Sequence, residues 1–305
     1  MRSKKDLVDR TYHKYKCSKT KIIKMVGIVE SSYYRVPSGG HKGNKASKLT
    51  YHKVNGYVDQ ATVVSAVKEI LSHEFIDCGY RLMCSYLKEQ GYMINHKKLY
   101  RIMKQANLLK LEHRINRSGS GRKFVQFRKV ITSRPMECLE MDIKVVWIPN
   151  MGKNAYLLSV IDVHTRRILK DYFAFNIKKK QVINLLSEMF EKFEYPENIV
   201  IRSDNGSQFI AKDVREYLKL IGVSQEFTHV ATPEENAHVE AYHGILKKEV
   251  FQRFEYRTFG EIEQILKRYV IFYNNIRHHG LLGRVTPMKK WSQQKRLILT
   301  KNKAA

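Results

Sequence analysis

The alternation of apolar and polar positions divides the chain into a basic helical N-terminal part and a more ordinary α/β part. Residues 1–35 are predicted to form short basic helices with a turn at Gly27. Residues 36–50 combine Pro, Gly, Ser and Lys without apolar periodicity, which indicates a linker. We therefore expect a basic helical region and linker over residues 1–57.

A clearer helical unit is predicted over residues 58–112. Apolar residues recur at helical spacing up to Gly91, and again after Asn95, which is a favourable N-cap. The second helix has a basic outer face, and the residues predicted to contact DNA there are Lys97, Lys98, Arg101 and Lys104. An apolar inner stripe and a basic outer stripe after a short turn suit a helix-turn-helix in a DNA major groove. The alternative is a solvated charged face.

Residues 113–132 are predicted to be a basic linker around a Gly/Ser core. Its cations, among them Arg122 and Lys123, could follow a phosphate backbone between two domains. The segment could equally be a linker without that role.

The pattern changes after Pro135. Apolar residues from Leu139 to Trp147 alternate with polar ones, including Glu140 and Asp142, as in a strand with one buried face. Further strands and amphipathic helices follow in the order β-β-β-α-β-α-β-α. This order predicts a mixed five-stranded sheet covered by helices.

We assign this α/β core to residues 133–253 and a basic helical segment to residues 254–305. The expected fold class is therefore an α/β core preceded by all-α helix-turn-helix-like domains.

The charge is strongly positive and uneven. The chain has 56 Lys and Arg against 29 Asp and Glu, a net charge of +27. Residues 1–130 hold 28 of these cations against 9 acids, and residues 131–305 hold 28 against 20. The N-terminal part is thus expected to bind a polyanion through a folded surface.

Four cysteines without a CxxC spacing predict reduced, mostly buried thiols and no zinc site. No apolar run reaches about 18 residues, and the N-terminus lacks the apolar part of a signal peptide. A cytoplasmic protein without a membrane span is expected.

Three carboxylates are the candidate catalytic residues. Asp142 lies in a predicted strand, Asp204 at a strand end and Glu240 on a helix, with 35 residues (205–239) between the last two. Three carboxylates can hold two Mg²⁺ ions, about 3.5–4 Å apart, over a phosphodiester. Alone this evidence is weak, because Asp204 heads an Asp-Asn-Gly turn that favours Asp locally. Asp162 is a fourth candidate, which we expect to be structural or to support the site through a neighbouring residue.

Cationic partners lie on the same helix as Glu240. His243 and Lys247 share one helical face with Glu240. The carboxylate is expected to bind metal, while Lys247 and His243 are predicted to contact DNA.

The sequence segments around these residues resemble those of a known family. MDIKVVWIP, IRSDNGSQF and NAHVEAYHGILKKEV resemble the catalytic core of DDE transposases and retroviral integrases. GYRLMCSYLKEQGYMINHKKLYRIMKQANLL and YNNIRHHGLLGRVTPMKKW look like the OrfB transposase of the insertion sequence 3 family. The resemblance covers nearly the whole chain, in order.

The resemblance implies a ribonuclease-H-like fold and a catalytic, metal-binding triad of Asp142, Asp204 and Glu240. It implies two Mg²⁺ ions, replaceable by Mn²⁺, and no zinc, because the retroviral His-His-Cys-Cys module is missing. Lys144 stands where the family commonly has Thr. The implied reaction nicks one transposon end, and the 3′-hydroxyl attacks the same strand near the other end. A circular intermediate is then integrated.

The resemblance also implies partners: double-stranded DNA with terminal inverted repeats, target DNA, and further copies of the chain on synapsed ends. An upstream OrfA product, or a frameshift fusion with it, is a further expected partner. The implied location is the bacterial cytoplasm, in association with the nucleoid.

Two questions stay open at this level. The C-terminal motif residues Tyr273, Asn274, Arg277 and His279 could contact DNA or another subunit, or could only cap and brace a helix; we predict a DNA contact for Arg277. The alternative functions are an inactive DNA-binding regulator or decayed copy, and a ribonuclease H-type nuclease. The nuclease would not need the two basic helical units.

Overall fold

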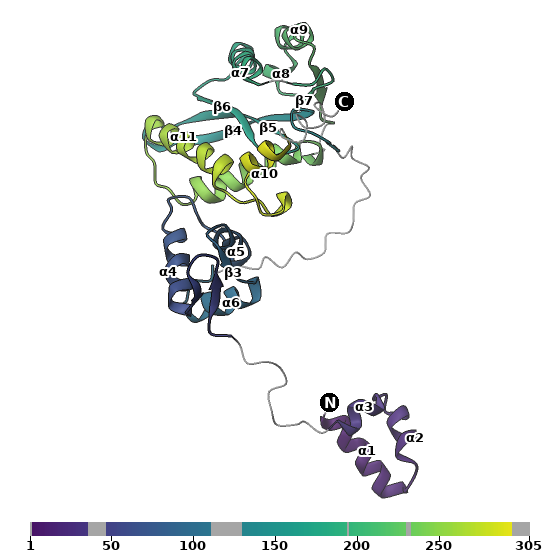
Figure 1. Cartoon of the computed structure of the whole chain (residues 1–305). Helices are drawn as coiled ribbons and strands as arrows, with labels where there is room; N and C mark the ends of the chain where they lie inside the picture. The colour runs from purple at the N-terminus through teal and green to yellow at the C-terminus, as the bar shows by residue number, and fades with distance from the viewer. Residues whose placement is uncertain (1, 36–46, 111–129, 194, 230–232, 295–305) are drawn as a thin grey trace, which may run out of the picture. The chain divides into compact units, whose positions relative to one another are not determined.

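The computed structural model describes residues 2–35, 47–110, 130–193, 195–229 and 233–294 (Figure 1). The predicted contacts of Arg122 and Lys123, and most of the 36–50 linker, lie outside these residues. The chain forms two compact units, Met1–Ser47 and Lys48–Ala305.

The first unit is a small helical bundle. It consists of α1 (Arg2–Tyr15), α2 (Lys19–Met25) and α3 (Glu30–Tyr34). The predicted turn at Gly27 is present, with a φ of +66° that glycine adopts without a steric penalty. The buried core of this unit comprises Val8, Ile22 and Ile23.

The second unit begins with an HTH-like part. Its elements are β1 (Thr50–His52), β2 (Gly56–Val58), α4 (Gln60–Leu71), α5 (Tyr80–Glu89), β3 (Tyr92–Met93) and α6 (His96–Gln105). Asn95 caps α6 as expected, because its side chain accepts the Lys98 N–H at 2.8 Å. An antiparallel sheet in the order β2-β1-β3 accompanies the helices. Strands of two or three residues are too short to show a period in the sequence.

The α/β core contains the predicted mixed five-stranded sheet. Its strands are β4 (Cys138–Ile148), β5 (Lys153–Asp162), β6 (Ile168–Ala174), β7 (Val200–Ser203) and β8 (Ser224–Phe227), in the order β6-β5-β4-β7-β8. The first three strands pair antiparallel, whereas β7 and β8 run parallel to β4. The sheet is thus ribonuclease-H-like, as predicted.

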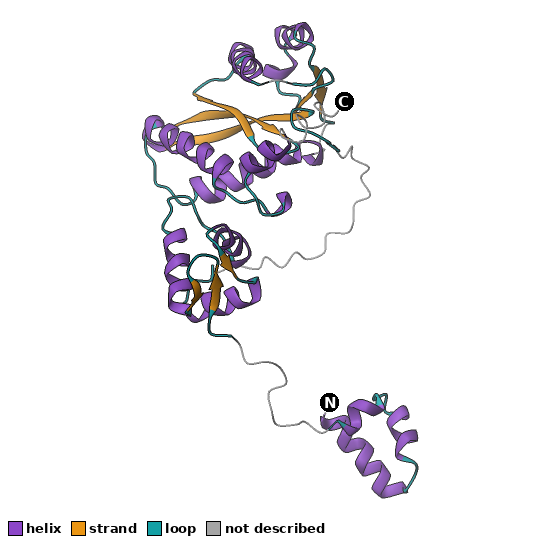
Figure 2. Cartoon of the chain, viewed as in Figure 1, coloured by secondary structure: helices purple, strands orange, loops and turns teal. Residues whose placement is uncertain are grey.

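Helices cover both faces of this sheet (Figures 1 and 2). One face packs against α7 (Lys179–Lys192), α8 (Ser207–Ile210) and α9 (Lys212–Leu220). The other face packs against α10 (Ala237–Leu246) and α11 (Phe259–Asn275). A π-helical turn, Lys247–Phe251, continues α10. Short 3₁₀ turns are Pro149–Met151, Pro233–Asn236 and Gly280–Leu282.

Strand β4 departs from the predicted single buried face. Val145 and Trp147 are exposed, whereas Val146 is buried on the opposite face. Glu140, expected on the polar side, is fully buried. The reason is that helices cover both sides of the sheet, so the strand is apolar on different faces at its two ends.

The HTH-like part shares its apolar core with the α/β core. Phe75, just after α4, contacts Phe254, Tyr269 and Phe272 with ring centroids 5.2 to 5.4 Å apart. The two parts therefore form one folded unit.

The four cysteines are free, as predicted; Cys84 and Cys138 are buried, Cys78 is half-buried and Cys17 is exposed. Over the residues that the structure describes, no helix is long and apolar enough to cross a membrane.

Candidate active site

Two of the predicted carboxylates lie on or just after the parallel strands β4 and β7. Strand β4 pairs with β7 from Cys138–Val200 to Glu140–Arg202, a constant offset of 62 residues (200 − 138). Asp142 lies on β4 two residues beyond the last of these pairs, and Asp204 lies one residue past the end of β7. Neighbouring residues of parallel strands point to the same side of a sheet. Asp142 is half-buried and Asp204 is exposed at this edge.

Glu140 holds the helix of the third carboxylate against β4. Its buried side chain accepts the N–H groups of His238 at 2.8 Å and Val239 at 3.0 Å, and lies 2.5 Å from the His238 ring nitrogen. A carboxylate at a helix N-terminus satisfies backbone donors and favours the helix dipole. Because Glu140 and Asp142 are two residues apart on one strand, they share a face. The first turn of α10, which contains Glu240, is thereby attached to β4.

The segment leading into α10 is tied to both central strands. Asn236 donates to the Met141 carbonyl at 3.3 Å. Arg202 on β7 donates to the Glu235 carbonyl at 3.0 Å and is held by Glu226 at 2.7 Å. These contacts set the start of α10 relative to β4 and β7 together.

His243 joins α10 to the row of side chains that contains Asp142. Its Nδ1 lies 3.2 Å from Asp142 Oδ2, and its Nε2 lies 3.5 Å from Ser159 Oγ. Ser159 pairs directly across from Asp142 in the sheet. Glu240 precedes His243 by three residues, so the exposed Glu240 lies one turn away on the same helical face.

The buried position of His243 contradicts the DNA contact that was predicted for it. Its side chain is only 5% exposed and faces Asp142 and Ser159, not solvent. The sequence placed His243 on the correct helical face, but that face turns inward at this residue.

The carboxylates also make local hydrogen bonds. Asp142 Oδ1 accepts the Ile143 N–H at 2.7 Å, and Asp204 Oδ1 accepts the Gly206 N–H at 3.0 Å, as in an Asx turn. Among the described residues, no three or more His, Cys, Asp or Glu side chains are close enough to hold a metal ion. The donor chemistry nevertheless fits Mg²⁺, which prefers carboxylate oxygens. Asp142, Asp204 and Glu240 would hold it.

Asp162 has the structural role that was expected of it. It is fully buried, and its oxygens accept the N–H groups of Met136 at 2.9 Å and Thr165 at 2.8 Å. The side chain thus fixes the turn after β5.

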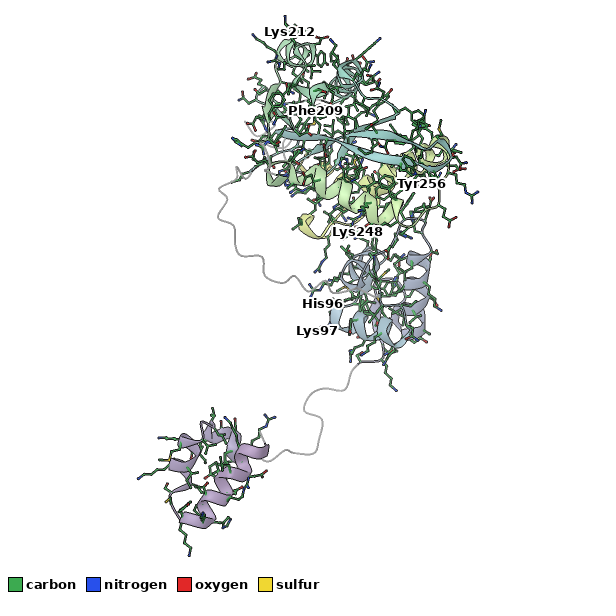
Figure 3. All side chains as sticks on the ribbon, turned by 180° about the vertical axis from the view of Figure 1, so that it is seen from behind. His96, Lys97, Phe209, Lys212, Lys248 and Tyr256 are labelled. Atoms are coloured by element: carbon green, nitrogen blue, oxygen red, sulfur yellow. The ribbon has the colours of Figure 1, made fainter. Side chains whose placement is uncertain are left out.

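Most of the cations predicted to contact DNA are exposed. Lys97, Arg101 and Lys104 lie at the surface of α6 (Figure 3 labels Lys97). Lys247 is exposed where the π-helical turn begins, next to Lys248, which Figure 3 also labels. Lys98 differs, because it is half-buried and donates to the Leu49 carbonyl. Burial, together with the charge of Arg101, lowers the pKa of Lys98. Lys98 therefore joins α6 to the chain just before β1.

Arg277 is part of an internal brace. Its Nε and Nη2 contact the Glu249 carboxylate at 2.9 and 2.8 Å, with both side chains under 15% exposed. Tyr269 also donates to Glu249, at 2.9 Å. Glu249 lies in the π-helical turn that starts at Lys247. The predicted DNA contact of Arg277 thus gives way to a role in holding this turn.

Other residues of the C-terminal motif follow the bracing alternative. Asn274 exchanges two hydrogen bonds of 2.9 Å with the backbone of Ile168 on β6. Tyr273 and His279 are buried. In this chain the motif locks α11 and the following loop to the core.

Comparisons with known proteins agree with this architecture. Two models described as an integrase core domain match residues 132–233 and 221–287, and a model described as an HTH-like domain matches residues 59–114. InsK of insertion sequence element IS150 from Escherichia coli (strain K12), which is named as a transposase, is 26% identical over 244 residues. That alignment covers 76% of this chain and 84% of InsK.

A protein of insertion element IS476 from Xanthomonas euvesicatoria is 24% identical over 209 residues, covering 68% of this chain and 59% of its own length. The catalytic core domain of BIV integrase is 16% identical, with a TM-score of 0.42, over 54% of this chain and 99% of that chain. The matched integrase core models together run from residue 132 to residue 287, just over half of the 305 residues. The chain therefore belongs to the insertion sequence 3 family of transposases as an OrfB component, with an HTH-like DNA-binding domain and a ribonuclease-H-like integrase core.

Proposed function

We propose that this transposase cleaves DNA strands at the ends of an insertion sequence and transfers the released ends to new DNA, with Asp142, Asp204 and Glu240 as the catalytic carboxylates. One observation carries the proposal. Asp142 lies on β4, Asp204 directly follows β7, the parallel strand that pairs with β4, and Glu140 ties the first turn of α10, which contains Glu240, to β4.

The three carboxylates would hold two Mg²⁺ ions, or Mn²⁺ in their place. Bound there, such ions activate an attacking oxygen and stabilise the leaving oxygen of an in-line displacement. The chain would supply the oxygen donors from β4, from the end of β7 and from α10. His243 orients Asp142 through one of its carboxylate oxygens.

The bond changes balance without an energy source. In the first step a water oxygen bonds to phosphorus as the bond from phosphorus to the 3′-oxygen breaks, and the leaving 3′-oxygen takes up a proton. In the second step the 3′-hydroxyl loses its proton and attacks another phosphodiester, whose own 3′-oxygen leaves and takes up a proton. The first step hydrolyses one phosphodiester, and the second step forms one phosphodiester for the one that it breaks.

DNA is the proposed partner of the exposed cations. The α6 face with Lys97, Arg101 and Lys104 is proposed to lie in a major groove at the terminal repeat. Lys247, seven residues after Glu240, is proposed to contact a phosphate of the DNA end. Two or more copies are proposed to act on synapsed ends, with an OrfA product as a further partner.

The test uses labelled duplexes that carry the terminal sequences flanking the gene. We expect nicking in Mg²⁺ or Mn²⁺, and a loss of nicking of at least about 10³-fold in Asp142→Asn, Asp204→Asn and Glu240→Gln. Each variant should still bind the duplex in a mobility-shift assay. The matched control is Glu216→Gln, an exposed acid on α9, which should cleave normally.

Cleavage that survives in any of the three variants removes that residue from the proposed triad. Binding by the wild-type chain without cleavage in either metal supports a DNA-binding regulator instead. Cleavage of RNA–DNA hybrids in preference to the terminal duplex supports a ribonuclease H-type nuclease.

A further inference from the structure

A basic hollow lies where the HTH-like part meets the segment after α11. Four cations from separate parts of the chain line it: Lys53 from the β1–β2 turn, Lys88 from α5, and Arg284 and Lys289 from the C-terminal segment. We propose that this hollow binds the phosphate backbone of duplex DNA, independently of sequence. The proposal rests on the proposed DNA-cleaving function and assigns a second DNA contact besides the α6 face.

The acid in the hollow leaves a surplus of positive charge. Glu89 is the acidic residue that lines it. One carboxylate oxygen of Glu89 contacts His278 at 2.9 Å, and the other contacts Lys289 at 2.8 Å. Lys53, Lys88 and Arg284 are exposed and make no ion pair with any other described residue, so their charges are available to an anion from outside.

Lys53 is presented by a rigid turn. The buried His52 ring accepts the N–H groups of Val54 at 3.3 Å and Asn55 at 3.1 Å on Nδ1. Its Nε2 therefore carries the proton and donates to the Gln90 carbonyl at 2.9 Å. The Lys53 N–H donates to the Gly91 carbonyl at 3.0 Å.

Gly91 is required for this arrangement. Its φ is +102°, and an added Cβ would lie 3.2 Å from the His52 ring. The hairpin turn is thus fixed to the end of α5, beside Lys88. A turn whose backbone is already ordered loses less entropy when it binds a ligand.

Arg284 is held in an uncommon backbone conformation. Its φ is +64°, in the left-handed region that residues other than glycine rarely adopt. The turn is closed by the Arg284 N–H donating to the His279 carbonyl at 2.9 Å, and by the His279 N–H donating to the Val285 carbonyl at 3.0 Å. The guanidinium group is therefore carried by a loop anchored to the core, while Lys53 and Lys88 belong to the HTH-like part.

The chemistry of the lining favours a DNA backbone over base recognition. Lys and Arg neutralise phosphates, and such contacts position a duplex without reading its sequence. The cations come from both parts of the second unit, so a bound strand would bridge the HTH-like domain and the segment that follows α11.

The experiment compares the affinity of the full chain for two duplexes, one with the terminal repeat and one of unrelated sequence, over a range of salt concentrations. The variant combines Lys53→Ala, Lys88→Ala and Arg284→Asn; asparagine tolerates the left-handed conformation at position 284. We expect both affinities to fall by the same factor, and the salt slope to decrease by about 1 for each cation removed. Thermal unfolding should be unchanged, because all three side chains are exposed.

The charge-matched control combines Lys192→Ala, Arg215→Ala and Lys219→Ala on α7 and α9. If the control lowers the salt slope as much as the hollow variant does, net charge explains the effect and the proposal fails. It also fails if the hollow variant keeps the wild-type slope, or loses affinity for the terminal duplex alone. A wild-type chain that binds neither duplex overturns the proposed function as well. If the wild type cleaves normally and the hollow variant keeps the wild-type affinity and salt slope, only the proposed role of the hollow is overturned.

Discussion

His243 Nδ1 lies 3.2 Å from Asp142 Oδ2, and this contact connects the helix of the third carboxylate with the strand of the first. The imidazole is buried between β4, β5 and α10, and its other nitrogen faces Ser159. A side chain with both ring nitrogens engaged can fix the rotamer of its carboxylate partner. His243 is therefore a positioning residue for Asp142.

Replacement of His243 by Ala should lower the nicking rate by about 10²-fold, because small displacements of a catalytic group are costly. The affinity for the terminal duplex should stay within about twofold of wild type, since the ring does not reach the surface. Gel-based single-turnover nicking and a parallel binding assay measure the two effects.

His243→Asn provides the rescue, because an amide N–H can replace Nδ1 as a donor to Asp142. We expect it to recover a substantial part of the lost rate. If His243→Ala instead weakens DNA binding and leaves the cleavage of bound DNA intact, His243 contacts DNA after all.

Glu140→Ala should destabilise the core by about 3 kcal/mol, since it leaves the N–H groups of His238 and Val239 buried without an acceptor. Urea unfolding measures the loss. Nicking should fall as well, because the first turn of α10 loses its attachment to β4.

Glu137→Ala is the control for Glu140→Ala. Glu137 also accepts backbone N–H groups, those of Ser133 and Arg134, but at the surface before β4. We expect a loss of stability below about 1 kcal/mol there. Equal losses in the two variants would show that the cap on α10 has no special role.

The sheet and the helices of the core were predictable because their apolar periods are long enough to be distinctive. The three candidate catalytic carboxylates were chosen by residue type, by spacing and by the resemblance of the surrounding sequence motifs to a known family. The roles of Glu140 and His243 were not predictable in the same way. Their burial depends on α10 crossing β4, a contact between residues about 100 positions apart.

One signal for Glu140 was present in the sequence. Glu140 and Asp142 are two residues apart on a strand, so they had to share a face, and an acid on that face can accept the N–H groups of a helix N-terminus. The small β2-β1-β3 sheet had no comparable signal. Its register depends on contacts with the end of α5. His52 donates to the Gln90 carbonyl, and Gly91 leaves room for the His52 ring.

Arg277→Ala should destabilise the chain by about 3–5 kcal/mol, because it leaves Glu249 charged and poorly paired in a nearly buried position. Arg277→Lys should restore little, since an ammonium group cannot reproduce the two-point contact. Thermal and urea unfolding measure both variants.

Lys267→Ala is the matched surface control for Arg277→Ala. Lys267 pairs with Glu263 at 3.0 Å on the outside of α11, and its loss should cost less than about 0.5 kcal/mol. A double variant, Arg277→Met with Glu249→Gln, should be more stable than Arg277→Ala, because it removes both buried charges. If Arg277→Ala unfolds like wild type but binds DNA weakly, the brace is not its main role.

Acidification should destabilise the chain through His279. Burial, followed by the charges of Arg277 and Arg166, lowers the pKa of the His279 imidazole to about 3. The geometry agrees, because Arg277 Nη1 can only donate, and it lies 3.4 Å from His279 Nε2, which must then be unprotonated.

The unfolded chain protonates His279 below its ordinary pKa of 6.5, whereas the folded chain does not until about pH 3. The unfolded state thus binds more protons in this window, and the free energy of unfolding falls as the pH drops below 6.5. Between pH 7.5 and pH 5, His279 should account for a loss of about 2 kcal/mol.

His279→Gln, which cannot titrate, should remove that part of the pH dependence. The measurement is urea unfolding of wild type and variant at intervals from pH 5 to pH 8, with His96→Gln as the control for removing an exposed imidazole. As the pH falls toward 5, the free energy of unfolding of the wild type should decrease relative to that of His279→Gln. A difference that stays constant over this range would mean that His279 accepts a proton in the folded chain, and that Arg277 moves away from its ring when it does.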